Sequence, residues 1–155
     1  MYQLVAEITA LFERLVAELP AGTATVHVRQ VTLGTVIEVR PANPACANFD
    51  VLTDDFEPYS FGIGQSRWSL RWERRGFRWE RSNRKGEKDV LTEIEEMARA
   101  VIAGNCEQRG GPFWLISKIH VGDYTYKKMD LAVLPISPFW TRRYAPFVNY
   151  RNRLP

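Results

Sequence analysis

The feature that most constrains the fold is a series of short segments, between residues 23 and 79, in which apolar and polar side chains alternate. Turn-forming residues separate these segments, which lie at 23–33, 35–40, 49–53, 59–64, 67–72 and 77–79. Alternation with a period of two is typical of strands that bury one face. Short turns join only antiparallel neighbours, so the pattern predicts an antiparallel meander. The alternation shifts parity between Val28 and Val31, which predicts a bulge near Gln30.

Two further segments have the helical period of 3.6 residues. The first, 4–19, places its apolar side chains on one stripe and ends at Pro20. The second, 90–102, is followed by Gly104, the residue type that most often ends a helix. The sequence therefore predicts two amphipathic helices that cover one face of the sheet. The residues of the first helix expected in the core are Ile8, Leu11, Phe12 and Leu15.

The last third of the chain predicts a hairpin and a tail. Segments 113–121 and 124–134 have strand character and meet at Gly122 and Asp123. The aromatic, arginine-rich stretch 139–155 follows, and nearby prolines predict that it lies extended across the domain. The predicted fold is thus α+β, a single domain spanning 1–155. It has an antiparallel meander sheet, an N-terminal helix and a second helix packed on one face, a C-terminal hairpin and an extended tail.

Composition agrees with one globular domain. The 155 residues are 45% hydrophobic and 25% charged, and a chain of this length can bury a sizeable core. Its first residues lack a secretion signal, and no apolar run approaches the length of a membrane span. Cys46 and Cys106 do not form a CxxC pair and are too few for a disulfide framework. We therefore expect a cytoplasmic protein with two reduced thiols and no membrane contact.

Charge is distributed unevenly along the chain. The net charge is only +3, but residues 1–66 carry three basic and eight acidic side chains, whereas residues 67–88 carry nine basic and three acidic ones. Residues 139–155 carry four arginines and no acid. Such segregation is typical of a protein whose partner is steered by charge.

Sequence motifs of catalysis are absent. The chain has no GxSxG elbow, no phosphate-binding glycine loop and no HExxH pair. Cys106 and His120 could in principle form a nucleophile and base, but no neighbouring residues support that pairing. Two cysteines and two histidines scattered singly do not have the spacing of a zinc site. The sequence predicts no catalytic residue, no metal and no cofactor.

A dense acidic cluster precedes one predicted strand. Its spacing does not match a calcium-binding loop, so we interpret it either as a solvated turn or as a docking patch for a basic partner. The residues of the cluster are Asp50, Asp54, Asp55 and Glu57. Tyr59, which follows, is a candidate aromatic anchor for a protein partner.

The basic segment 67–88 is predicted to be a hairpin. Its aromatic residues Trp68 and Trp72 alternate with arginines, so the aromatics face the core and the arginines face outward. Phe77 and Trp79 continue the apolar face on the return strand. The arginine face could be solvated, could dock a protein, or could bind nucleic acid through charge. Its arginines are Arg67, Arg71, Arg78 and Arg84, among others.

The tail is rich in residues that often anchor interfaces. Trp, Tyr and Arg dominate protein-binding hot spots, and the tail contains Trp140, Arg142, Arg143 and Tyr144. We interpret it as a strap across the domain, with a free binding segment as the alternative.

Several stretches resemble small bacterial proteins of the toxin-immunity type. They are the glycine-containing strand 59–64, the Trp-Glu strand ending, the helix 93–104 and the closing Tyr-x-x-x-x-x-Tyr-Arg at 144–151. This resemblance implies a non-enzymatic inhibitor that binds a cognate toxin tightly. A nucleic-acid-associated module using hairpin 67–88 is the alternative expectation, and a small enzyme is the third.

Overall fold

The structure, a computed structural model, describes residues 3–54, 58–75, 77–81, 90–131 and 139–148, with backbone only at 72–75 and 79–81. Two helices and eleven strands lie within these ranges. In chain order they are α1 (Gln3–Ala17), β1 (Ala24–Val31), β2 (Gly34–Pro41), β3 (Phe49–Thr53), β4 (Pro58–Ile63), β5 (Ser66–Ser69), β6 (Trp72–Arg75), β7 (Arg78–Arg81), α2 (Val90–Ile102), β8 (Cys106–Gly110), β9 (Leu115–Val121), β10 (Tyr124–Asp130) and β11 (Trp140–Arg143).

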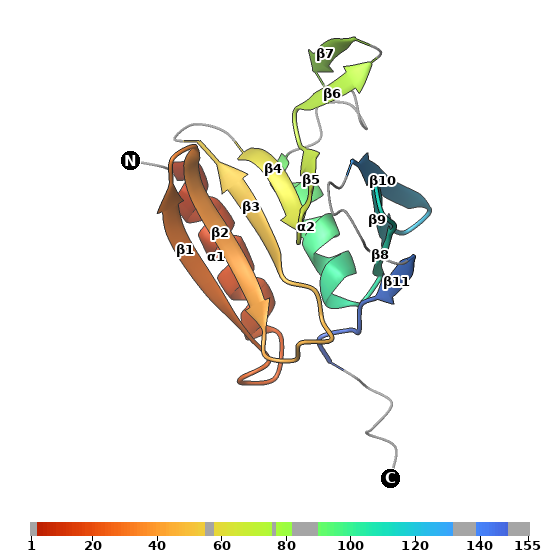
Figure 1. Ribbon diagram of the computed structural model, residues 1–155. Coiled ribbons are helices and arrows are strands. Elements are labelled where there is room, and N and C mark those ends of the chain that lie inside the picture. Colours follow the sequence, from red (N-terminus) through yellow and green to blue (C-terminus); the bar gives the residue numbers. More distant parts are fainter. Residues whose placement is uncertain (1–2, 55–57, 76, 82–89, 132–138, 149–155) are drawn as a thin grey trace.

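Strands β1 to β5 form a five-stranded antiparallel meander in sequence order (Figure 1). The predicted α+β fold with a meander sheet is therefore confirmed. Its first turn depends on Gly34, which has a φ of 141°. A Cβ atom at this position would lie 2.1 Å from the carbonyl oxygen of Thr53 on β3. Only glycine can accommodate both the backbone conformation and this close approach.

A second, four-stranded antiparallel sheet has the order β10-β9-β8-β11. It contains the hairpin predicted from the sequence, as β9 and β10, and two strands that the sequence pattern did not indicate. Strands β6 and β7 form a separate two-stranded ribbon that projects beyond the end of β5 (Figure 1). The strand expected at 67–72 is thus divided at Leu70 and Arg71 between the meander and this ribbon.

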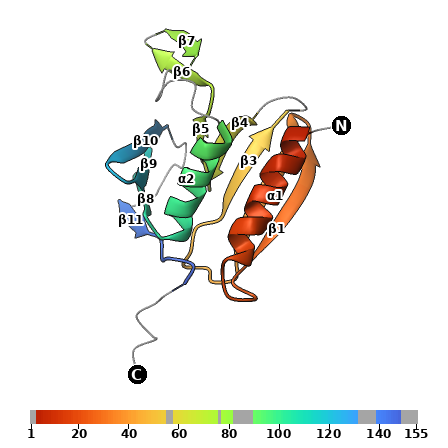
Figure 2. The same ribbon diagram turned by 180° about the vertical axis from the view of Figure 1, so that it is seen from behind.

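Both helices lie on the same side of the meander (Figures 1 and 2). The buried residues of α1 are the four predicted from its apolar stripe, Ile8, Leu11, Phe12 and Leu15. Helix α1 packs against β1 and β2, and α2 also packs against β9 of the second sheet. Neither helix in the described ranges is long and apolar enough to cross a membrane.

Phe49 lies at the centre of the core and has no exposed surface. Its ring meets the ring of Phe12 edge to face at 5.3 Å and stacks on that of Phe61 at 5.7 Å. On a third side it lies 6.2 Å from the ring of Phe147, which belongs to the tail. One side chain therefore joins the first helix, the meander and the C-terminal segment.

The tail forms a strap along the surface between the two sheets. After β11, three backbone hydrogen bonds attach it to segments far away in the sequence. The donors are the N–H groups of Tyr144, Ala145 and Phe147, and the acceptors are the carbonyls of Cys106, Ala45 and Ile102. The strap crosses directly over Gly104, where a Cβ atom would lie 2.6 Å from the nitrogen of Pro146. The prediction that the tail crosses the domain is confirmed for residues 139–148.

The two sheets meet along a seam of buried polar side chains. The hydroxyl oxygens of Ser66 on β5 and Ser117 on β9 are 2.5 Å apart. The Gln108 amide donates to Ser117 Oγ at 3.0 Å and to the carbonyl of Ile63 at 3.4 Å. Gln108 Oε1 in turn accepts a hydrogen bond from the Tyr144 hydroxyl. These bonds satisfy groups that would be costly to bury alone, and they fix the position of one sheet relative to the other.

Two local predictions are wrong. Strands β1 and β2 pair continuously from Ala24 to Val31, so there is no bulge near Gln30. The parity shift in the sequence arises because Val31 is the last strand residue before the turn and lies on the other face. The irregularity lies instead in the pairing of β3 with β4, between Leu52 and Thr53. Phe77 is not part of an apolar face, because it lies in the turn between β6 and β7 with 99% of its surface exposed.

Candidate functional site

Two of the residues expected to bind a partner instead bind each other. Asp50 on β3 and Arg67 on β5 form a bidentate ion pair across the meander, with N–O distances of 2.6 and 3.1 Å. Between them on β4 lies Gly62, whose missing side chain leaves room for the guanidinium to reach the carboxylate. Each charge is neutralised by the other within the fold, so neither is available as a main contact for a binding partner.

The rest of the acidic cluster and of the basic hairpin is only partly described. Asp54 is exposed after β3, and Tyr59 is 60% exposed on β4. Arg71 is half-buried, and Arg78 is exposed at the start of β7. Asp55, Glu57 and Arg84 lie outside the described residues.

Three of the four tail candidates attach β11 and the strap to the domain. The Trp140 ring lies against Gly110, where a Cβ atom would be only 2.3 Å from the indole. Arg142 donates to the carbonyl of Pro44 at 2.8 Å, and its guanidinium lies 4.8 Å from the centroid of the Tyr144 ring. Burial raises the pKa of the Tyr144 hydroxyl, which donates to Gln108 in the seam. The fourth candidate, Arg143, points to solvent with 80% of its side chain exposed.

Arg143 belongs to a row of charges across the outer face of the four-stranded sheet, the face turned away from α2. The strand register places Lys127, Lys118, Glu107 and Arg143 side by side on the four strands. Glu107 lies 3.4 Å from Lys118 Nζ and 3.7 Å from Arg143 Nε. Arg109, two residues further along β8, is exposed on the same face.

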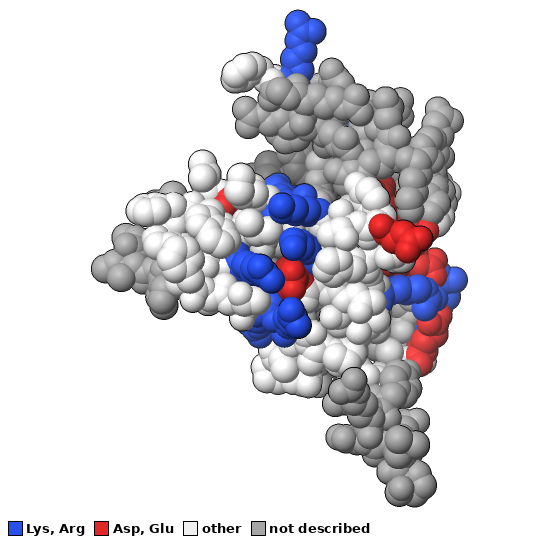
Figure 3. All heavy atoms as spheres, turned by 90° about the vertical axis from the view of Figure 1, so that its right-hand side faces the viewer, with Lys and Arg blue, Asp and Glu red and all other residues white. Residues whose placement is uncertain are grey.

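Figure 3 looks at this side of the molecule and shows basic side chains gathered around one acidic group. We call this surface the basic sheet face. It consists of Arg109, Lys118, Lys127 and Arg143 around Glu107. The single carboxylate compensates one of four positive charges, so the face keeps an excess of positive charge that can attract an acidic partner over several ångströms.

Exposed apolar side chains continue this face at one end of the same sheet. Met129 lies beside Ile116 and Arg109 in the strand register. Leu131 directly follows β10, and Phe139 directly precedes β11, with its ring 6.1 Å from that of Trp114. Their exposures are 67% for Met129, 86% for Leu131 and 77% for Phe139. We call these three residues the apolar end. Met129 and Leu131 lie at the β10 edge and Phe139 at the β11 edge, so exposed apolar groups flank this end of the sheet on both sides. Exposed apolar groups on one surface can mark an interaction site.

The cysteine and histidine named in the sequence as a possible pair do not meet in the described part of the chain. Cys106 pairs with Ile119 on the inner face of the sheet, whereas His120 is exposed, so the two do not face each other. Burial raises the pKa of the Cys106 thiol to about 12, which keeps it protonated and a poor nucleophile at neutral pH. Ser66, hydrogen-bonded to Ser117 and to Asp130, is fully buried and out of reach of a substrate. The described residues contain no cluster of three or more potential metal ligands.

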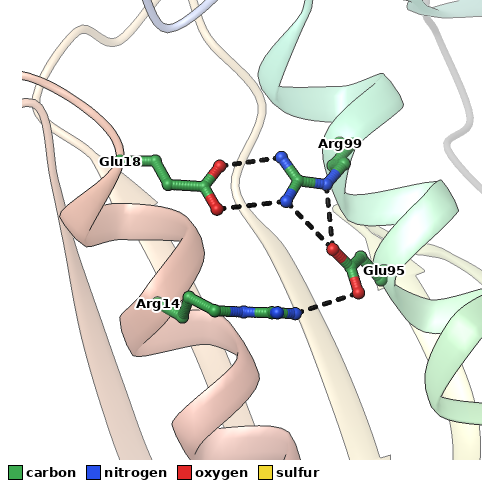
Figure 4. Close-up of polar contacts among 4 residues, drawn as sticks. All are labelled: Arg14, Glu18, Glu95 and Arg99. Atoms are coloured by element: carbon green, nitrogen blue, oxygen red, sulfur yellow. Dashed lines mark hydrogen bonds and ion pairs between the residues drawn. The ribbon is translucent and has the colours of Figure 1, made fainter.

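A shallow, open groove of about 420 Å³ lies between the helices, lined by residues that include Leu11, Leu91 and Glu95. A solvent-exposed set of ion pairs beside this groove, which we call the clamp, joins α1 to α2 (Figure 4). Arg99 donates hydrogen bonds to both carboxylate oxygens of Glu18 and to Glu95, and Glu95 also accepts a hydrogen bond from Arg14. The hydrogen bonds from Arg99 lower the pKa of Glu18. The clamp fixes the helices side by side, and we assign it a structural role.

Comparison with known proteins gives no family to which the chain can be assigned. No protein-family model, no curated protein and no solved structure matches it. The interpretation of the site therefore depends on its own geometry and charge.

The sequence pattern identified one residue of the basic sheet face, Arg143, and missed the other four. Glu107, Arg109, Lys118 and Lys127 lie on three different strands in a segment, 89–138, whose net charge is slightly negative. Counting charges segment by segment along the chain therefore did not reveal these residues. The signal that could have found them is the alternation within each strand, which puts Lys118 and Lys127 on the solvent side of the predicted hairpin.

Proposed function

We propose that this protein is a non-catalytic protein-binding domain whose binding surface is the basic sheet face together with the apolar end. The observation that supports the proposal is the combination of both features on one exposed sheet surface. Apolar anchors provide most of the affinity in protein interfaces, whereas surrounding charges set orientation and association rate. A surface with both properties fits an acidic protein partner.

Glu107 favours a protein over a nucleic acid as the partner. It lies in the middle of the basic sheet face, with 15% of its side chain exposed. A phosphate backbone crossing that face would approach this carboxylate, whereas a protein can place a donor or a cation there. The apolar end also has no counterpart in binding through phosphates alone. Arg67, a leading candidate of the basic hairpin, is neutralised by Asp50.

The concrete form that we propose is an immunity-type inhibitor, in which the acidic partner is a cognate toxin. The resemblance noted in the sequence and the excess positive charge of the basic sheet face support this form. An inhibitor needs a surface that binds rapidly and tightly and needs no catalytic group.

A quantitative pull-down from the native host, with mass spectrometry, compares the wild-type protein with two matched charge reversals. Lys127→Glu changes the basic sheet face, and Arg78→Glu makes the same change of charge at an exposed position in the ribbon. We expect one acidic protein to be recovered with the wild type and with Arg78→Glu, and to be depleted with Lys127→Glu.

Binding kinetics of the recovered partner then separate the two parts of the surface. Lys127→Glu should slow association about threefold to tenfold at low salt, and less at high salt. Met129→Ala should mainly accelerate dissociation. If Arg78→Glu loses the partner and Lys127→Glu keeps it, the ribbon is the site and the proposal is wrong. Nanomolar binding of an oligonucleotide at physiological salt, lost with Lys127→Glu, would make the domain a nucleic-acid binder.

A further inference from the structure

The outer edge of the meander is an unprotected strand. Strand β1 pairs with β2 along all eight residues from Ala24 to Val31, without a bulge. Among the described residues, no strand pairs with its other side, and both ribbon views place it at the border of the molecule (Figures 1 and 2). The strand contains no proline and no lysine, and Arg29 is its one charged residue. Proteins that remain monomeric usually protect an edge strand with a bulge, a proline or lysines.

Apolar side chains line this edge on the helix side. Val28 is 49% exposed, and Val26 is half-buried beside it. On α1, the side chains of Arg14 and Glu18 point toward α2 (Figure 4). Helical geometry puts Val5 and Val16 on the opposite flank, toward β1, where both are half-buried. The free edge and a strip of four valines therefore form one continuous surface.

We propose that β1 pairs with β1 of a second copy of this chain, antiparallel, about a two-fold axis at His27. Two copies would then share one continuous ten-stranded sheet, and the valine strips of the two protomers would meet. The surface is distinct from the basic sheet face, so this proposal is independent of the proposed function. A two-fold axis requires a self-complementary edge, and the sequence of β1 meets that requirement.

The register follows from the residues brought opposite each other. With the axis at His27, Val26 lies opposite Val28 of the other protomer, and Thr25 lies opposite Arg29, so no two arginines face each other. An axis one residue further, at Val28, would place His27 opposite Arg29. The two-residue turn at Thr32 and Leu33 is compatible with both registers, so the side-chain pairs decide between them. It directs the backbone groups of alternate residues, including Val26 and Val28, to the free side.

Cysteine cross-linking in the full chain tests the register. In His27→Cys the two thiols would face each other across the axis, at the short separation of a directly opposed pair. In Thr25→Cys, the matched control, each thiol would lie opposite Arg29 of the other protomer, so the two thiols would not face each other. The natural thiols of Cys46 and Cys106 are both buried and do not compete. Under mild oxidation we expect a disulfide-linked dimer with His27→Cys at least about tenfold more abundant than with Thr25→Cys. Equal cross-linking of both variants would overturn the register.

Sedimentation equilibrium tests the dimer itself. We expect the wild-type chain to dimerise with a dissociation constant of about 10–100 µM, and Val28→Lys to raise that constant at least tenfold. Leu33→Lys is the control, since Leu33 is 71% exposed but lies in the turn beyond the strand. It should leave the dimer unchanged. Circular dichroism checks that both variants are folded. A wild type that is monomeric at about 200 µM, or a dimer unaffected by Val28→Lys, would overturn the proposal.

Discussion

Replacing Phe147 with alanine tests whether the strap is part of the cooperative core. The ring of Phe147 is 7% exposed and lies 6.2 Å from the ring of Phe49. Its backbone N–H donates to the carbonyl of Ile102 at 2.8 Å, which fixes the strap against the end of α2. The side chain thus fills space between the meander and the strap, and neither neighbour can close that space without moving backbone.

The expected cost follows from the size of the space that is emptied. Truncation of a buried phenylalanine to alanine costs about 3–5 kcal/mol, and the slight exposure of this ring favours the lower end. We therefore expect a loss of about 3 kcal/mol in the free energy of unfolding, or about 6–12 °C in melting temperature for a chain of this size. Phe49→Leu combined with Phe147→Ala should show a coupling of about 0.5–1.5 kcal/mol, the contribution of the ring pair.

Urea denaturation followed by circular dichroism and by tryptophan fluorescence measures these values. Phe139→Ala is the matched control, because it removes the same side chain from the same segment at a position that is 77% exposed. It should change the free energy of unfolding by less than about 0.5 kcal/mol. If Phe147→Ala costs less than about 1 kcal/mol, or if the two phenylalanines show no coupling, the strap is not part of the core and the reasoning fails.

Two further predictions concern single sites. Gly62→Ala should separate the ion pair, because its Cβ atom would lie 2.9 Å from Arg67 Nη1 and 3.1 Å from Asp50 Oδ1, and should destabilise the fold by about 1 kcal/mol. In the double variant, Asp50→Asn should then add little to this loss. Full additivity of the two substitutions would contradict this account. Burial raises the pKa of Cys106 from 9.0 to about 12, so its stabilising contribution is complete below pH 9 and falls as the pH rises toward 12. Urea midpoints at pH 8 and pH 10 should therefore differ more for the wild type than for Cys106→Ala, and an equal difference would refute the assignment.

The elements with regular apolar periods could be predicted from the sequence. Helix α1 buries the four residues that its stripe indicated, because a helix packed on a sheet exposes its other side to water. The meander followed from alternation and turn residues in the same way. Strand β8 had no such signal, because its inward residues are Cys106, Gln108 and Gly110. Cys106 lies in the apolar core, Gln108 in the polar seam and Gly110 against the Trp140 ring. These three residue types together do not make an apolar alternation.

The candidate site was harder to predict because it depends on residues far apart in the sequence. Asp50 and Arg67 are 17 residues apart, and only the register across Gly62 shows that they neutralise each other. Strand β11 is polar and short, and it forms because the strap brings it beside β8. Arg143 thereby comes next to Glu107 and completes the basic sheet face. Neither of these two charge pairs can be recognised from the charges of one continuous segment of the sequence.

The strap also affects the order in which the chain can fold during its synthesis. Helix α1 and strands β1 to β3 leave the ribosome early and include Phe12 and Phe49. One side of Phe49 stays uncovered until Phe147, almost a hundred residues later, has emerged and packed against it. Domains that close late expose apolar surface for longer and depend more on chaperones. A nascent chain whose residues 139–148 are still inside the ribosome should therefore bind chaperones, whereas one from which these residues have emerged can form the contact between Phe147 and Phe49.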